Sequence, residues 1–169
     1  MERPIWAPWR MEFIQAPKAP GCIFCEFPAA PEAEDRANLV VHRSAHAFTC
    51  LNKYPYTSGH LMVIPRAHVA ELSALPPGAW ADLQEELRRA VAVLQAVYRP
   101  EGMNVGMNLG KPAGAGIEAH LHWHVVPRWV GDNNFMPVIA DQRVVPEALE
   151  AAWERLRAGF QAGFQAAPP

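Results

Sequence analysis

The last third of the chain carries three histidines that alternate with bulky apolar residues, in the run HLHWHVVP at 120–127. A period of two is typical of a β-strand, in which successive side chains point to opposite faces. We therefore predict a strand over 120–127, with His120, His122 and His124 on one face and the apolar residues in the core. Same-face neighbours lie roughly 6.6 Å apart along a strand, so the imidazoles form a row rather than a cluster around one point.

Three interpretations fit such a row. The histidines could belong to an ordinary exposed strand face, although strict alternation of one residue type argues against chance. Two of them could ligate a catalytic metal as an HxH pair, because imidazole is a common metal ligand. One could instead be a nucleophile, since histidine has a pKa near 6.5 and is largely neutral at working pH.

The segment GKPAGAG at 110–116 directly precedes the row and contains three glycines. Glycine lets backbone N–H groups turn inward to form an anion-binding nest. Lys111 adds a positive charge that suits a phosphate. Alone, such a loop is more typical of a plain turn. Beside imidazoles it favours a reaction in which a ring nitrogen attacks phosphorus, forming a phosphoramidate that an acceptor then splits.

Cys22 and Cys25 form a CxxC pair, a motif found both in redox enzymes and in zinc sites. A thioredoxin-type pair follows a strand and opens a helix, and the flanks of this pair, rich in proline and glycine, predict neither. Zinc is therefore favoured, with two further ligands brought in by the fold from residues such as His68 and His120. The alternative is that both cysteines are small buried residues, as we expect for Cys50 in its apolar strand.

Composition and charge exclude several classes of protein. The 169 residues are 50% hydrophobic and 19% charged, which predicts a single domain over 1–169. No apolar run approaches the roughly 18 residues of a membrane span, and no signal-peptide core is present. Fifteen Lys and Arg against seventeen Asp and Glu provide no basic surface for a nucleic acid. Three cysteines, an odd number, fit a reducing cytoplasm better than a disulfide framework.

Short strands and two amphipathic helices predict an α+β fold with a largely antiparallel sheet. Strands are expected at 39–42, 47–51, 61–64 and 103–109, besides the histidine strand. A long helix ending at 99–102 is predicted by an apolar stripe of Trp80, Leu83, Leu87, Val91, Leu94 and Tyr98. A last helix is expected from Pro146 to about Arg157.

The two ends of the chain differ from its body. Segment 1–20 is expected to be irregular, but Trp6 and Trp9 are too large and apolar to lie in solvent. We expect these two residues to dock on the body or on a second subunit. Residues 161–169 are expected to form a mobile tail.

Three separate stretches carry a family resemblance. Residues 120–126 match a His-x-His-x-His signature followed by two apolar residues, and LN at 51–52 with GHLMVIPRAH at 59–68 is similar to a second characteristic stretch. In this order and spacing they resemble the histidine triad family, and CIFC at 22–25 is similar to its zinc-binding branch. Within the family, the chain most resembles the bacterial diadenosine tetraphosphate phosphorylases. That narrower resemblance rests on WAPWR at 6–10, YPY at 54–56, NVGMNLG at 104–110, VPRW at 126–129 and NFMP at 134–137.

The resemblance implies an antiparallel sheet flanked by helices, paired into a homodimer, and a nucleotide as substrate. His122 would be the nucleophile that takes a nucleotidyl group from the α-phosphorus, and His124 would contact the phosphate. Asn52 lies where the family contacts ribose, and Asn108 where it contacts phosphate. A structural zinc would be held by Cys22, Cys25, His68 and His120. No organic cofactor is implied.

One departure from the family pattern affects the expected acceptor. Many hydrolases of the family carry Gly-Gln-Ser or Gly-Gln-Thr before the triad, but here the corresponding positions are Ala115, Gly116 and Ile117. Backbone N–H groups of Gly114 to Gly116, together with Lys111, would then bind phosphate. This favours orthophosphate as acceptor. The alternatives are transfer to water from the same substrates or from nucleoside phosphoramidates, a non-catalytic nucleotide-binding protein, and a zinc hydrolase whose metal the triad holds.

Overall fold

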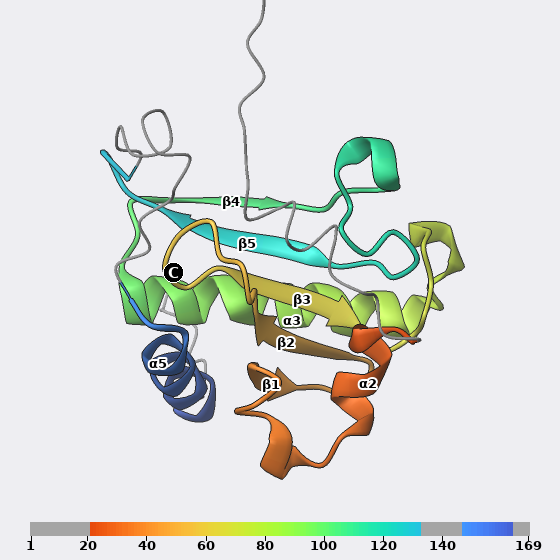
Figure 1. Cartoon of the computed structure of the whole chain (residues 1–169), viewed down its shortest axis with the longest axis horizontal. Coiled ribbons are helices and arrows are strands. Elements are labelled where there is room, and N and C mark those ends of the chain that lie inside the picture. Colours follow the sequence, from red (N-terminus) through yellow and green to blue (C-terminus); the bar gives the residue numbers. More distant parts are fainter. Residues whose placement is uncertain (1–20, 133–146, 164–169) are drawn as a thin grey trace, which may run out of the picture.

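The computed structural model describes residues 21–132 and 147–163, whose arrangement is shown in Figure 1. The described strands are β1 (Val40–Arg43), β2 (Ala47–Leu51), β3 (Leu61–Pro65), β4 (Gly102–Gly106) and β5 (Trp123–Arg128). The α-helices are α2 (Ile23–Ala29), α3 (Pro77–Tyr98) and α5 (Leu149–Gln161). Short 3₁₀ helices are η1 (Glu32–Glu34), η2 (Leu72–Ala74) and η3 (Lys111–Ala113).

The strands form one antiparallel sheet in the order β1-β2-β3-β5-β4. β2 and β3 pair along their whole length. β5 lies between β3 and β4, which places His124 opposite Met62 on one side and opposite Gly106 on the other. The predicted α+β fold with an antiparallel sheet is confirmed, and β2 has the predicted bounds.

The histidine strand is shorter than predicted. β5 begins at Trp123, so His120 and His122 lie in the segment that leads into it. The strand starts late because the backbone N–H of Leu121 bonds to the loop after β3, rather than to β3 itself. The predicted division of faces still holds. Leu121 belongs to the core cluster beneath α3, whereas His120 and His122 contact Phe24 on the opposite side.

One face of the sheet is covered by α3, which runs behind the strands in Figure 1, and α5 packs beside α3 and β1. Leu83 and Leu94 of the predicted stripe are fully buried. Trp80 was expected on the same face but is exposed, because Ala79 takes the buried position in this first turn. The helix ends as predicted, with Arg99 in the left-handed conformation at φ 48°.

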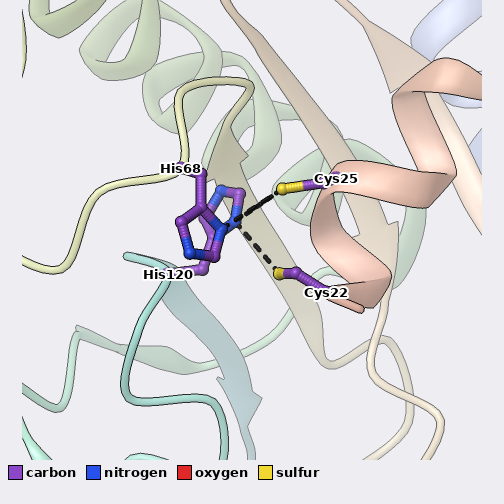
Figure 2. Close-up of side chains that lie close together, drawn as sticks. All are labelled: Cys22, Cys25, His68 and His120. Atoms are coloured by element: carbon purple, nitrogen blue, oxygen red, sulfur yellow. Dashed lines mark hydrogen bonds between the residues drawn. The ribbon is translucent and has the colours of Figure 1, made fainter. Parts of the chain in front are cut away.

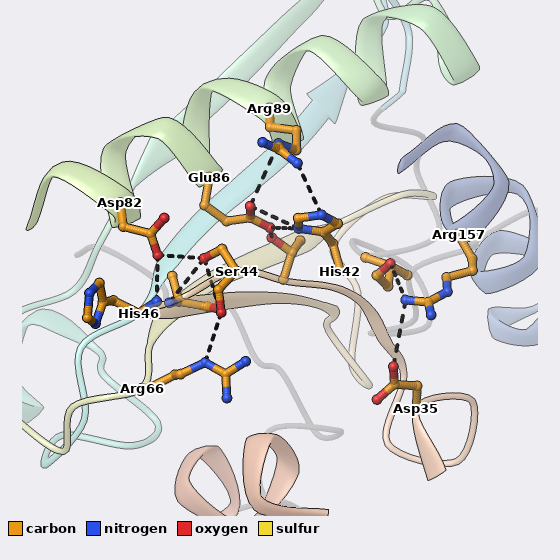
Figure 3. A network of polar contacts seen from close by, with 12 residues as sticks. Asp35, His42, Ser44, His46, Arg66, Asp82, Glu86, Arg89 and Arg157 are labelled. Atoms are coloured by element: carbon orange, nitrogen blue, oxygen red, sulfur yellow. Dashed lines mark hydrogen bonds and ion pairs between the residues drawn. The ribbon is translucent and has the colours of Figure 1, made fainter. Parts of the chain in front are cut away.

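Polar contacts also tie α3 to β1 and β2 (Figure 3). Glu86 is 1% exposed, and its carboxylate accepts hydrogen bonds from the Thr49 hydroxyl at 2.6 Å and from His42 Nδ1 at 2.8 Å. One turn earlier, Asp82 accepts a bond of 2.7 Å from the Ser44 hydroxyl. A buried carboxylate needs such partners, so this network fixes the register of α3 on the sheet.

The opposite face is partly covered by α2. This helix begins directly after Cys22, so the CxxC pair opens a helix, contrary to the prediction. The helix forms because Phe24 is buried against the sheet, in an apolar cluster with Phe48 and Ile64. Pro28 is accommodated near the end of this short helix. The sequence flanks alone did not reveal this tertiary contact.

Other boundaries differ by a few residues, and some predictions lie outside the described ranges. The predicted strand 103–109 is β4, which ends at Gly106 because the chain turns away toward the glycine loop. α5 ends at Gln161 rather than near Arg157, so the first residue of the predicted tail is helical. The predictions for segment 1–20, including Trp6 and Trp9, and for 164–169 concern residues that are not described. No helix of the described residues is long and apolar enough to cross a membrane.

Candidate active site and metal centre

The four predicted metal ligands, Cys22, Cys25, His68 and His120, come together where α2 meets the sheet (Figure 2). Their ligand atoms all lie within 4.8 Å of one another. Nδ1 of His120 is 3.3 Å from Sγ of Cys22 and 3.7 Å from Sγ of Cys25, which is itself 3.3 Å from Nδ1 of His68. In tetrahedral zinc sites, sulfur at about 2.3 Å and nitrogen at about 2.0 Å are separated by roughly 3.5 Å. The spacing therefore fits zinc.

The environment of His120 supports this fit. The residue is 1% exposed, and the carbonyl oxygen of Pro65 accepts its Nε2–H at 2.7 Å. Nδ1 is then unprotonated and faces the two sulfur atoms, which is the state that a metal requires. A backbone carbonyl commonly orients metal-binding histidines in this way. Burial and the neighbouring thiol of Cys22 raise the pKa of Cys25, and a cation between the thiols would reverse that shift.

His122 has one ring nitrogen engaged and one available. Its Nδ1–H donates to the backbone carbonyl oxygen of His120 at 2.9 Å. The neutral ring therefore carries its lone pair on Nε2. The residue is 5% exposed, and its ring lies edge-on to that of His124, with the centroids 5.0 Å apart. An unprotonated ring nitrogen with fixed orientation is what nucleophilic attack by histidine requires.

His60 and His124 form a hydrogen-bonded pair of imidazoles. It is fully buried, and the backbone N–H of Tyr56 donates to its Nδ1 at 3.1 Å. The proton of the neutral ring must then sit on Nε2, from which it is donated to Nδ1 of His124 at 2.9 Å. His124 in turn carries its own proton on Nε2. The two rings of the row thus differ in the atom that they leave available, which is a lone pair on His122 and an N–H donor on His124.

The surroundings keep these rings uncharged near neutral pH. Burial lowers the pKa of His124 to about 4, with a contribution from the neighbouring charge of His122. Burial lowers the pKa of His60 to about 3, and His124 and His122 add to this effect. Burial also lowers the pKa of His122, although its bond to the His120 carbonyl acts in the opposite direction. All three imidazoles are therefore neutral at pH 7.

A groove with a volume of about 400 Å³ opens beside His124, between β4 and the loop that precedes β3. Asn108, which was predicted to contact phosphate, lines this groove together with Arg128. Asn52 lies outside it. The side chain of Asn52 accepts the backbone N–H of Tyr54 at 2.9 Å, at the start of the loop that leads to His60.

The glycine loop contains the short 3₁₀ helix η3 and hydrogen bonds within the loop. Lys111 is exposed and is not among the residues that line the groove. The backbone N–H groups of Ala113, Gly114 and Ala115 donate to the carbonyl oxygens of Gly110 and Lys111. In this conformation the N–H groups of Gly114 and Ala115 are engaged within the loop, and the binding of phosphate by this loop stays a prediction. Gly116 is exposed after this turn.

The sequence did not settle the roles of two residues at the site, and for His60 it left open whether the ring orients another group or only packs. His60 lies in the second family stretch, but its contact with His124 joins residues 64 positions apart and has no local signal. Phe24 lies within the CxxC pair, and its ring contacts both His120 and His122. The apolar character of this residue gives no sign of these contacts.

The model of the HIT domain family matches residues 33–130, more than half of the chain. The chain belongs to the HIT domain family. This confirms the family resemblance seen in the histidine row and in the stretch at 59–68. The HIT chain is 40% identical over 151 residues to the AP-4-A phosphorylase of Mycobacterium tuberculosis, covering 86% of this chain and 77% of the relative.

Two further similarities are to a protein named as an enzyme and to a structure that contains zinc. The HIT chain is 29% identical over 109 residues to the asymmetrical bis(5'-nucleosyl)-tetraphosphatase of Schizosaccharomyces pombe, covering 64% of this chain and 56% of the relative. It is also similar to a crystal structure described as a zinc-bound histidine triad family protein from Mycobacterium smegmatis. That similarity has a TM-score of 0.65 at 28% identity and covers 84% of this chain and 94% of the other.

Proposed function

We propose that this HIT protein is an enzyme that splits a phosphoanhydride bond of a dinucleoside polyphosphate, with diadenosine tetraphosphate as the reference substrate. His122 takes up the nucleotidyl group, and orthophosphate releases it. The observation that carries the proposal is the pair of hydrogen bonds made by Nδ1 of each ring, to the His120 carbonyl and to His60, which together imply a lone pair on Nε2 of His122 and a proton on Nε2 of His124. The 40% identity to a relative named AP-4-A phosphorylase supports the substrate class.

The reaction proceeds by two displacements at the α-phosphorus. Nε2 of His122 forms a bond to phosphorus as the bond to the bridging oxygen breaks, and ATP leaves with that electron pair. The Nε2–H of His124 stabilises the charge that develops on the phosphoryl oxygens. Asn108, which lines the groove beside His124, supplies a further amide donor. An oxygen of orthophosphate then attacks the same phosphorus and displaces His122, which yields ADP.

Product analysis tests both the nucleophile and the acceptor. Diadenosine tetraphosphate is incubated with the protein, with and without orthophosphate, and the nucleotides are separated. We expect ADP and ATP only when orthophosphate is present. The His122→Asn variant should be folded and inactive, because its amide cannot form the intermediate. Substantial turnover by this variant refutes the nucleophile assignment.

Transfer to water is the second candidate, favoured by the similarity to the tetraphosphatase of Schizosaccharomyces pombe. In that case AMP and ATP appear without orthophosphate. A zinc hydrolase is disfavoured by the ligand set, because two thiolates and two imidazoles fill a tetrahedral zinc site and leave no open position for water. A nucleotide-binding protein without catalysis would bind diadenosine tetraphosphate tightly and yield no products in either reaction.

Zinc is part of the proposal as a structural element. Cys22, Cys25, His68 and His120 would hold it, and the ion would cross-link α2 to the loop after β3 and to the start of the histidine row. Free thiols in such a site fit a reducing compartment, so we also propose a cytoplasmic location. Elemental analysis of protein purified without chelator should find one zinc per chain.

A homodimer is proposed from the open side of the sheet. β4 is the last strand in the described sheet, and Val105 within it is 45% exposed. Leu109, which follows β4, is 50% exposed, and Val130, which follows the neighbouring strand β5, is 89% exposed. Exposed apolar residues beside an edge strand favour pairing with a second copy. Analytical ultracentrifugation should give twice the chain mass, whereas a monomer would contradict the proposal.

A further inference from the structure

We propose that the metal-binding end of the sheet positions the nucleophile, and that Phe24 couples the two. The inference rests on the proposed role of His122. It adds a positioning function to α2, which otherwise carries only metal ligands and core contacts. Two separate contacts connect the metal ligands to His122, one through a side chain and one through the backbone.

The side-chain connection is the ring of Phe24. This residue stands between Cys22 and Cys25 in the first turn of α2 and is 2% exposed. Its ring packs edge-on against His120, with centroids 5.5 Å apart and planes at 85°. The same ring packs against His122 at 5.2 Å and 55°. One buried aromatic ring therefore contacts a metal ligand and the nucleophile at the same time.

The backbone connection is the carbonyl group of His120. Its oxygen accepts the Nδ1–H of His122 at 2.9 Å and thereby keeps the lone pair of that ring on Nε2. The imidazole of His120 is held from both sides, by the Pro65 carbonyl and by the sulfur atoms of the cysteines. The two connections are complementary, because the carbonyl fixes which nitrogen is protonated and Phe24 limits the tilt of the ring.

The way in which α2 is held against the sheet explains why the metal would affect the contact between Phe24 and His122. The helix has seven residues, too few to be stable without tertiary contacts. Near its C-terminal end, Arg43 donates to the carbonyl oxygens of Phe27 and Pro28. At the other end, the attachments are the cysteine side chains and Phe24. Ligation of Cys22 and Cys25 therefore sets where the Phe24 ring lies against His122.

The test compares two matched phenylalanines of the same apolar cluster. Phe24→Leu removes the ring contact with His122, whereas Phe48→Leu removes an equally buried ring that makes no ring–ring contact with a histidine among the described residues. Both substitutions should lower Tm to a similar extent. Displacing a catalytic group by about 1 Å costs on the order of 100-fold in rate. We therefore expect kcat of Phe24→Leu to fall about 10- to 100-fold, with KM changed less than about threefold and bound zinc retained.

A second readout does not depend on turnover. In protein labelled with 15N-histidine, the signals of His122 are identified by their loss in His122→Asn and report which ring nitrogen carries the proton. Wild type should show protonation on Nδ1 alone. Phe24→Leu should show a mixture of the two forms, because a ring that is free to tilt loses its hydrogen bond to the His120 carbonyl in part of the molecules. Wild type should show the same mixture after zinc is removed by a chelator. Phe48→Leu should match wild type.

The outcomes separate this inference from the proposed function. If Phe24→Leu and Phe48→Leu agree in kcat and in the His122 signals, Phe24 does not position the nucleophile. If wild type does not process any dinucleotide, the proposed function fails, and the 15N signals still decide the positioning role. If Phe24→Leu does not fold, Phe24→Met, with a longer flexible side chain, takes its place with the same expectations.

Discussion

Acidification should destabilise this protein steeply between pH 6.5 and 5, and His60 should account for a measurable share of the loss. Burial lowers the pKa of His60 to about 3 and that of His124 to about 4, whereas an unfolded chain has histidine pKa values near 6.5. Below pH 6.5 the unfolded state therefore binds protons that the folded state excludes. The stability that these two neutral histidines contribute is fully present above pH 6.5, and it decreases as the pH falls toward their pKa values in the folded protein.

The magnitude follows from these pKa values. Each histidine that stays neutral in the folded state costs about 1.4 kcal/mol of stability per pH unit below 6.5. Between pH 7.5 and pH 5, His60 and His124 should each remove about 2 kcal/mol, or about 4 kcal/mol together. A typical domain has only about 5–15 kcal/mol of stability, so this loss is large. His60→Gln removes one titrating group and retains an amide donor near the position of Nε2.

The assay is urea unfolding of wild type and His60→Gln at several pH values from 7.5 to 5. Groups outside the substituted position titrate in both proteins, so the difference between the two isolates His60. We expect His60→Gln to be the less stable protein at pH 7.5 but to lose about 2 kcal/mol less on acidification. Parallel stability curves for the two proteins would show that His60 is not held neutral, and the proton assignment of His124 would then fail as well.

Three further predictions concern the metal, the catalytic donor and the packing of α5. Cys25→Ser should abolish zinc binding in elemental analysis and remove about 4 kcal/mol in urea unfolding, the stabilisation given by a ligand at 1,000 times its Kd. His124→Asn should lower kcat about 100- to 1,000-fold in the product assay with little change in KM, because it removes one donor to the developing charge. Gly159→Val should cost about 1–3 kcal/mol in urea unfolding, since a Cβ at this position lies within 2.9 Å of two valine side chains of α3. Its exposed neighbour provides the control, and Ala158→Val should change stability by less than about 1 kcal/mol.

The sequence was sufficient to predict an element of the fold where the pattern of residue types along that element determines it. Strand 47–51 has the predicted bounds because every residue of it is apolar or β-branched and its flanks are polar turn residues. The long helix ends where a proline and a glycine follow its last apolar residue. The period of two in this segment also predicted that Leu121 and the three histidines would point to opposite faces of the sheet.

The features that the sequence did not predict depend on contacts between residues that are far apart along the chain. α2 forms because Phe24 packs on strands that lie elsewhere in the chain, so the flanks of the CxxC pair predicted no helix. The protonation of His124 depends on His60, whose own state depends on a backbone N–H in a loop. The sequence left open whether the glycine loop forms an anion-binding nest or a plain turn, because glycine content alone does not distinguish these conformations; the N–H groups of Ala113, Gly114 and Ala115 bond within the loop.

The three imidazoles of the row have different chemistry because each has different partners. His120 uses Nε2 for a carbonyl and Nδ1 for the thiols, so neither nitrogen is available to a substrate. His122 uses only Nδ1 and keeps a lone pair, whereas His124 accepts at Nδ1 and keeps a proton. The rings of His122 and His124 lie 5.0 Å apart between their centroids, but neither ring is among the four residues whose ligand atoms cluster around His120. The proposed metal ligand, the proposed nucleophile and the proposed donor thus occupy every second position from the segment before β5 into the strand, and the partners of each ring decide its chemistry.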